Sequence, residues 1–94
     1  MLARNDTAED LPAERVLIEI VENQIHDGTP PETRATLERL IATGESREDA
    51  VHLIACVLSA EMFEMLEEKR VFDAVRYARH LHALPALPYD EDEL

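Results

Sequence analysis

The sequence has few of the residues on which several large protein classes depend. Among 94 positions it contains one cysteine, two glycines, no tryptophan and four other aromatic residues. The single cysteine, Cys56, permits no disulfide within the chain, so an apolar core must hold the fold, as is usual in a reducing cytoplasm. Two glycines supply neither a glycine-rich phosphate loop nor a G-x-S-x-G nucleophile turn. We therefore do not expect nucleotide-dependent or serine-hydrolase chemistry.

Basic residues are also scarce. Nine Lys and Arg stand against 21 Asp and Glu, which gives a formal net charge of −12. Phosphate contacts and anionic lipids both require basic side chains, so this balance argues against nucleic-acid and membrane partners. No apolar run approaches the roughly 20 residues of a membrane span, and the first residues lack the apolar segment of a signal peptide. We expect a cytoplasmic protein.

The chain divides into one expected domain and two tails. Apolar residues make up 46% of the sequence, which is enough for a single small core at this length. Residues 1–10 predict a flexible N-terminal tail, residues 11–89 a single helical domain, and residues 90–94 an acidic C-terminal tail. The two tails carry net charges of −2 and −4, so half of the negative charge lies outside the expected domain.

Apolar residues recur at helical spacing throughout the expected domain, and no segment alternates as a strand does. The pattern predicts an all-α, four-helix bundle-like fold. The expected helices cover about 11–26, 30–43, 47–68 and 74–84. The third is apolar over most of its circumference, which predicts a long central helix with the others packed around it. Towards its C-terminal end the apolar pattern narrows, and the residues expected to face water there are Glu61, Glu64, Glu67 and Glu68.

Residues with specific end-capping chemistry mark the helix boundaries. The side chains expected to accept a backbone N–H as N-caps are Asp10, Thr29, Ser46 and Asp73. The residues expected to end helices are Gly28, Gly44 and Pro85. Phe72 is expected to pack against Tyr77 as a hydrophobic staple. The residues of the last helix expected to point inward are Val75, Ala78, Leu81 and Leu84.

The central helix carries the residues best suited to metal or thiolate chemistry. His52 and Cys56 are four residues apart, so they share a helix face. With Glu22 or another carboxylate of the first helix, they could bind a metal ion, or the imidazole could activate the thiol. A lone cysteine on an apolar helix is more typical of a packing residue, and no C-x-x-C or H-E-x-x-H motif completes a site. We expect no cofactor, with a metal ion as the alternative.

Other polar residues have both a structural and a functional interpretation. Gln24, which follows Asn23 in the sequence, lies on the apolar side of the first helix, and a buried amide needs hydrogen-bond partners. It is expected either to bond the backbone of the turn at 30–31 or to line a pocket, and a structural role is favoured. His80 and His82 diverge by about 200° on a helix, so we expect them to be solvated.

Apolar residues near the end of the third helix provide the main functional lead. Met62, Phe63, Met65 and Leu66 extend its apolar surface beyond what three short helices can cover. The sequence therefore favours a non-enzymatic interaction module that forms a homodimer or docks on an unidentified protein. One alternative is a metal-binding domain or vestigial metal-dependent enzyme that uses His52 with first-helix carboxylates. Another is an acidic binder of a basic protein.

A series of short motifs resembles a family of small bacterial all-helical domains of unknown function. The motifs are ENQ at 22–24, TPPE at 29–32, LERL at 37–40, AVH at 50–52, and FD at 72–73 leading to LP at 84–85. The resemblance covers about residues 11–85 and implies a helical domain. Members of that family tend to carry an H-x-x-x-H pair in the first helix and a histidine at the start of the central helix, which implies a metal site. Here Glu14 and Ile18 occupy the first two positions and His52 persists, so the resemblance supports the fold more than an activity.

Overall fold

The structure is a computed structural model that describes residues 12–88. Its helices are α2 (Pro12–Asp27), α3 (Pro31–Ala42), α4 (Arg47–Glu68) and α5 (Ala74–Ala83). Residues 12–88 contain no strand, and the predicted all-α, four-helix bundle-like fold is confirmed, with each helix end within one residue of its expected position. The predicted tails and the N-cap Asp10 lie outside the described residues.

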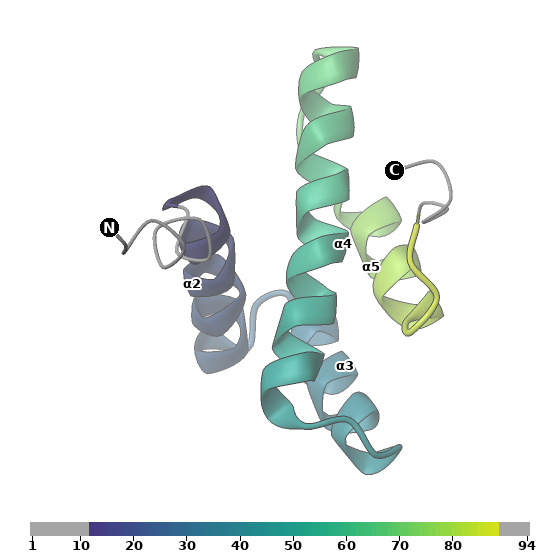
Figure 1. Ribbon diagram of the computed structural model, residues 1–94. Helices are drawn as coiled ribbons and strands as arrows, with labels where there is room; N and C mark the ends of the chain where they lie inside the picture. The colour runs from purple at the N-terminus through teal and green to yellow at the C-terminus, as the bar shows by residue number, and fades with distance from the viewer. Residues whose placement is uncertain (1–11, 89–94) are drawn as a thin grey trace.

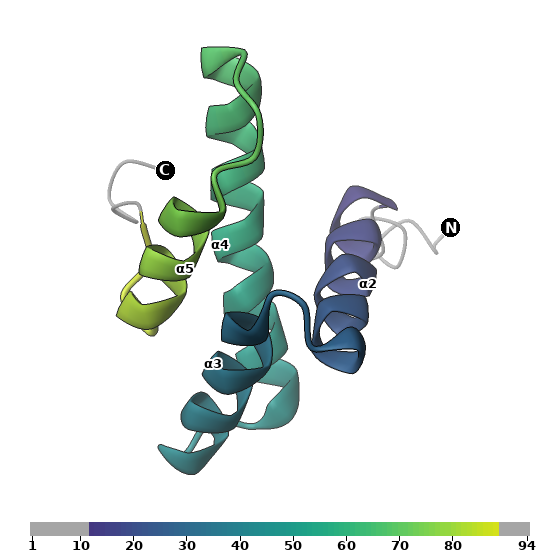
Figure 2. The same ribbon diagram turned by 180° about the vertical axis from the view of Figure 1, so that it is seen from behind.

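Helix α4 is the centre of the molecule. It contacts each of the other three described helices, and both views show its C-terminal end projecting beyond them (Figures 1 and 2). The large apolar residues of the core are Val21, Ile25, Leu37, Leu40, Val51, Ile54, Val57, Leu58, Tyr77, Leu81 and Leu84. On α4 the buried residues end at Glu61, so the last two turns lie outside the core. Within the described chain, no helix is both long enough and apolar enough to cross a membrane.

Two of the expected N-caps are confirmed. The Ser46 hydroxyl accepts the backbone N–H of Asp49 at 3.0 Å and caps α4. The Asp73 carboxylate accepts the backbone N–H of Arg76 at 3.0 Å and caps α5. Each bond satisfies one of the N–H groups that the first turn of a helix leaves without a partner. Ser46 therefore sets the start of α4, and Asp73 sets the start of α5.

The expected cap of α3 is wrong. Thr29 does not cap this helix, because Pro31 takes the first helical position and Pro30 becomes the N-cap, with no side-chain hydrogen bond. Thr29 is therefore one residue too early for its hydroxyl to reach the first turn. The backbone carbonyl of Pro30 instead accepts the N–H of Thr33 at 3.2 Å. Proline tolerates both positions because the first helical N–H groups have no intrahelical acceptor.

The predictions for Phe72, Gly28 and Gly44 are confirmed, whereas the prediction for Val75 is wrong. The Phe72 and Tyr77 rings meet edge to face with their centroids 5.3 Å apart, which confirms the staple. Gly28 and Gly44 follow their helices with φ of 70° and 113°, as a left-handed helix end requires. Val75, however, is 71% exposed, and the prediction that it points inward is wrong. It lies two residues before Tyr77, which places it on the opposite side of α5.

Two arginines of α3 bind the C-terminal ends of other helices. Arg34 donates from Nε and Nη2 to the backbone carbonyl of Ile25, at 2.9 and 2.7 Å, at the end of α2. Arg39 donates to the carbonyls of Leu84, at 2.9 Å, and Leu81, at 3.0 Å, at the end of α5. The last carbonyls of a helix lack the usual intrahelical partners, and these guanidinium groups supply donors to them. The Leu81 carbonyl also accepts the N–H of Leu84 at 3.2 Å. Helix α3 is thereby tied to two helices by polar bonds as well as by packing.

Candidate interaction surface

Exposed apolar residues are frequent in the sequence between the last turns of α4 and the first turn of α5. Seven large hydrophobic residues of the described chain are exposed, and five of them lie between residues 63 and 75. We call these five the α4–α5 patch: Phe63, Leu66, Val71, Phe72 and Val75. Leu66 is 72% exposed and Val71 84% exposed. Single exposed apolar residues are ordinary on protein surfaces, whereas a cluster of them marks a candidate binding site.

The four residues expected to form an interface occupy different environments. Met62 packs against the core, and Met65 is half-buried. Phe63 and Leu66 are exposed on the projecting part of α4 (Figure 1). Val71, Phe72 and Val75 were not expected in an interface. Residues 71 and 72 lie between helices, where helical periodicity assigns no direction, and Val75 was expected to point inward. A hollow of about 350 Å³ runs along this connecting segment and is lined by residues 70–75.

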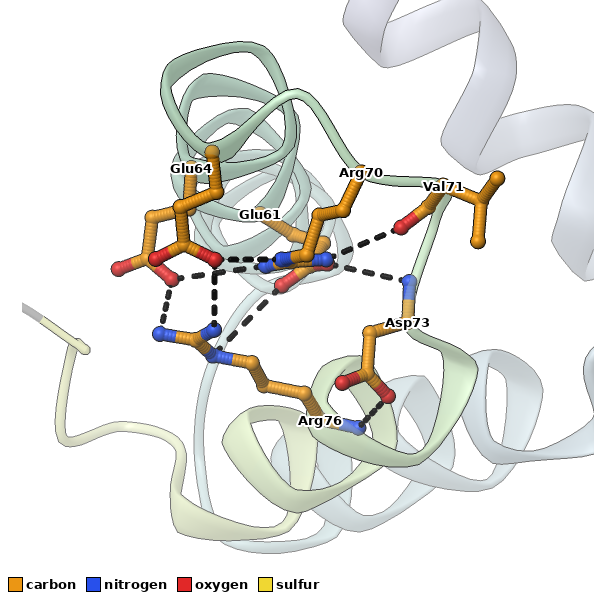
Figure 3. A network of polar contacts seen from close by, with 7 residues as sticks. Glu61, Glu64, Arg70, Val71, Asp73 and Arg76 are labelled. Carbon is orange, nitrogen blue, oxygen red and sulfur yellow. Dashed lines mark hydrogen bonds and ion pairs between the residues drawn. The ribbon is translucent and has the colours of Figure 1, made fainter.

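A buried carboxylate fixes the geometry beside the patch. The side chain of Glu61 is fully buried, and its Oε2 accepts a hydrogen bond from Arg70 Nη1 at 2.9 Å. The same oxygen accepts the backbone N–H of Asp73 at 3.2 Å, and Arg70 Nη1 also donates to the carbonyl of Val71 at 3.1 Å (Figure 3). Charge-assisted hydrogen bonds of this kind are stronger than neutral ones. Glu61 therefore ties α4 to both ends of the connecting segment.

Two more glutamates of α4 complete what we call the ion-pair network. Arg70 Nε donates to Glu68 Oε1 at 2.7 Å, and Arg76 from α5 forms an ion pair with Glu64. Arg76 also lies 4.0 Å from Glu61 Oε1, measured from Nε, and 3.9 Å from Glu68 Oε1, measured from Nη1. Figure 3 shows the guanidinium groups of Arg70 and Arg76 both directed at these carboxylates. Two arginines thus hold three carboxylates across the junction of α4 and α5.

The position of Glu61 corrects a prediction. It was expected to face water with Glu64, Glu67 and Glu68, but it is 1% exposed as a residue. Glu61 follows Val57 by four residues and so continues the buried face of α4. A carboxylate at such a position is stable when cations accompany it, and here they come from Arg70 and Arg76. Glu67 and Glu68 are exposed as predicted, and Glu64 is half-buried.

Two members of the ion-pair network, Arg70 and Glu68, have pKa values that are shifted towards their charged forms. Hydrogen bonds to Glu61 and then to Glu68 raise the pKa of the Arg70 guanidinium above its usual range. The hydrogen bond from Arg70 lowers the pKa of the Glu68 carboxyl. Both shifts favour the ionised forms that pair with each other.

The turn after α4 depends on one left-handed residue. Lys69 has φ of 54° and caps the helix, and the N–H of Arg70 bonds the carbonyl of Met65 at 3.1 Å. Lys69 is the one residue other than glycine with positive φ in the described chain. This turn directs the chain back along α4 and brings Arg70 to Glu61.

The structure brings His52 close to one first-helix carboxylate, Glu14, whereas Glu22 pairs with Arg47. His52 Nδ1 lies 3.8 Å from Glu14 Oε2, and both side chains are about half exposed. Glu22 instead accepts hydrogen bonds from Arg47 at 2.8 and 2.9 Å, and these bonds lower the pKa of its carboxyl. Cys56 is half-buried. Residues 12–88 hold no group of three or more His, Cys, Asp or Glu placed to bind a metal ion, and the metal site stays a prediction.

Gln24 joins three helices. Its Oε1 accepts hydrogen bonds from Thr33 Oγ1 at 2.7 Å and from the Tyr77 hydroxyl at 2.8 Å. The favoured structural role is therefore observed, but the partners are side chains of α3 and α5 rather than the backbone of the turn. Burial raises the pKa of Tyr77, although the hydrogen bonds with Thr33 and Gln24 act in the opposite direction. Asn23 is exposed.

The two histidines of α5 have different environments. His82 is exposed, as predicted. His80 is half-buried, and its Nδ1 is covered without a hydrogen-bond partner in the described chain. The prediction of a solvated side chain is therefore wrong for His80.

Comparisons with known proteins identify no relative of this chain. A scan against protein-family models gives no match to this chain, and searches of curated proteins and of solved structures give no significant match either. The resemblance to small bacterial helical domains stays a prediction.

Proposed function

We propose that this protein is a non-enzymatic interaction module whose docking surface is the α4–α5 patch. The observation that carries the proposal is the concentration of five of the seven exposed large hydrophobic residues within 13 consecutive positions. Small proteins that act alone seldom leave such clusters in contact with water. Two of the five are phenylalanines, and aromatic residues are enriched at the centres of protein interfaces.

Covering the patch contributes about as much free energy as association costs. The exposed fractions of its five side chains range from 39% to 84% and together equal about three fully exposed residues. Burying a large apolar side chain contributes roughly 1.5–3 kcal/mol, so covering the patch contributes about 5–10 kcal/mol. Association itself costs about 4–15 kcal/mol in lost freedom. Binding therefore requires that the partner bring comparable apolar surface of its own.

The ion-pair network supports the proposal by fixing the surface before binding. Arg70 and Asp73 are both bonded to Glu61, so the segment that carries Val71 and Phe72 is held against α4. A surface that is ordered in the free protein loses less conformational entropy when a partner binds.

A site-specific photocrosslinker tests the proposal. Benzoylphenylalanine is introduced in place of Leu66 in one variant of the full chain and in place of Ala42, which is exposed at the end of α3, in the control. Irradiation in cells that produce the protein is expected to give a discrete adduct from position 66 and none from position 42. If position 66 gives no adduct, or if both positions give the same adducts, the proposal is overturned.

A further inference from the structure

We infer that the acidic segment 90–93 of this chain docks on the exposed face of α5 in the same molecule. Positions 90–93 read DEDE and lie outside the described residues. The face that this segment occupies is defined by Val75, Arg79 and His82, and we call it the α5 face. The contact lies within one molecule, so it does not depend on a partner for the α4–α5 patch.

The sequence that leads into the acidic segment has the opposite charge. Residues 74–89 form the longest stretch of the chain without an acidic residue, and they contain two arginines and two histidines. Their formal net charge is +2, whereas it is −8 for residues 12–73 and −4 for residues 90–93. The next longest stretch without an acidic residue, residues 50–60, has no arginine or lysine either. The acidic segment is therefore joined to a basic stretch inside an otherwise acidic chain.

Arg79 is the free cation of this stretch. Arg76 is paired with Glu64 in the ion-pair network, whereas Arg79 is exposed and forms no ion pair or hydrogen bond within residues 12–88. Val75 lies four residues before Arg79 and His82 three residues after it, so the three share one side of the helix. All three are exposed. The α5 face thus offers a guanidinium without a partner to a segment made of carboxylates.

The chain after α5 turns back along the helix and brings the acidic segment within reach. The N–H of Ala86 bonds the carbonyl of Ala83 at 2.9 Å, and Leu87 packs against the core. Both ribbon views show residues 85–88 running beside α5 (Figures 1 and 2). The four acidic positions follow Pro88 by two to five residues, so an extended chain carries them up to about 7–18 Å from it. Helix α5, with ten residues, is about 15 Å long.

Attachment to the same chain favours this segment over a separate acidic partner. A separate acidic protein is repelled by the formal net charge of −12. A segment held on a short tether has an effective concentration in the millimolar range, so a weak attraction is enough to dock it. Contacts between exposed charges are weak and are screened by salt. The docked state should therefore be lost in concentrated salt.

Photocrosslinking within the full chain tests the inference. Benzoylphenylalanine replaces Leu94, which follows the acidic segment, so the four negative charges stay in place. After irradiation in low salt, trypsin and mass spectrometry are expected to show an adduct between the peptide that carries position 94 and peptide 71–76, which contains Val75. The yield of this adduct is expected to fall about twofold or more in two cases: when all four acidic residues are replaced by their amides, and when the salt is raised to about 1 M.

A matched pair of substitutions assigns the contact to the α5 face. Arg79→Gln removes the free cation of this face and is expected to lower the adduct yield about twofold or more. Lys69→Gln is the control, because Lys69 is also exposed and forms no ion pair within residues 12–88. The control is expected to give the adduct yield of the wild type. Circular dichroism confirms that each variant folds.

Four results would overturn the inference. No adduct with peptide 71–76 would show that the segment does not reach α5. Equal yields before and after the segment is neutralised would show that charge does not hold it there, and equal effects of Arg79→Gln and Lys69→Gln would place the contact elsewhere. In a mixture of ¹⁵N-labelled and unlabelled chains, adducts that join the two kinds would show docking on another copy. None of these results alters the crosslinks from position 66, which test the proposed function separately.

Discussion

Replacing Glu61 with glutamine tests whether the buried carboxylate holds the end of α4 to α5. Glu61→Gln keeps the size of the side chain and removes its charge. The new amide oxygen can still accept the N–H of Asp73, but Arg70 loses a fully buried anionic partner at 2.9 Å. The substitution therefore isolates the charged part of the interaction.

The expected loss in the free energy of unfolding depends on the partners that Arg70 keeps. Removing one member of a buried ion pair costs about 3–5 kcal/mol, and a hydrogen bond to a charged group contributes about 1.5–3 kcal/mol. Arg70 keeps Glu68 as a partner at 2.7 Å, and its side chain is 23% exposed. Because Arg70 keeps one partner and is partly exposed, we expect the smaller of these two costs, a loss of about 1.5–3 kcal/mol in the free energy of unfolding. The midpoint of thermal unfolding should fall by roughly 6–24 °C for a domain of this size.

Urea unfolding followed by circular dichroism at 222 nm measures the effect. Glu67→Gln is the matched control, because Glu67 is an exposed glutamate on the same helix, and it should stay within about 0.5 kcal/mol of the wild type. A double-mutant cycle with Arg70→Gln should show a coupling energy of about 1.5–3 kcal/mol. If Glu61→Gln is as stable as the control, or if the coupling is zero, then the network does not hold the junction of α4 and α5.

Three further predictions concern other parts of the structure. Lys69→Gly should stabilise the fold by up to about 1 kcal/mol in urea unfolding, because glycine adopts the left-handed conformation without a side-chain clash; a loss of stability would contradict this account of the turn. Since burial raises the pKa of Tyr77, its contribution to stability is complete below the unfolded pKa of about 10 and is lost as the pH rises above that value. Urea midpoints between pH 9 and 11 should therefore fall less in Tyr77→Phe than in the wild type, and equal slopes would refute the assignment. Arg39→Met should cost about 1.5–3 kcal/mol, because it leaves the carbonyls at the end of α5 without their charged donor. Glu38→Gln, an exposed change on the same helix, should cost less than about 0.5 kcal/mol, and an equal effect of the two would contradict the tie between α3 and α5.

Most of the fold could be predicted because local chemistry determines it. The start of α4 follows from the capping residue Ser46. The staple between Phe72 and Tyr77 follows from residue type and spacing alone. The Thr29 cap failed because two consecutive prolines allow two registers for the start of α3, and the sequence does not choose between them.

The candidate site was less predictable because it depends on contacts between distant residues. Phe63 and Leu66 could be found from the helical pattern. Glu61 was missed because a glutamate is normally exposed, and its burial requires Arg70 and Arg76 to be brought back by the turn at Lys69. Val75 was missed for a related reason: the face of α5 that packs inward is set by Tyr77, whose hydroxyl bonds Gln24 more than 50 residues earlier in the chain.

The arginines of α3 have a consequence for which positions of this chain can change. A guanidinium that binds backbone carbonyls requires nothing of the side chains at those residues, since every amino acid offers the same carbonyl. Exposed positions at the ends of α2 and α5, such as His26 and His82, can therefore mutate while Arg34 and Arg39 keep their bonds. Loss of either arginine cannot be compensated by a single change at the residues it binds. In a set of diverged sequences, the two arginines of α3 should therefore stay constant while the helix ends that they hold vary.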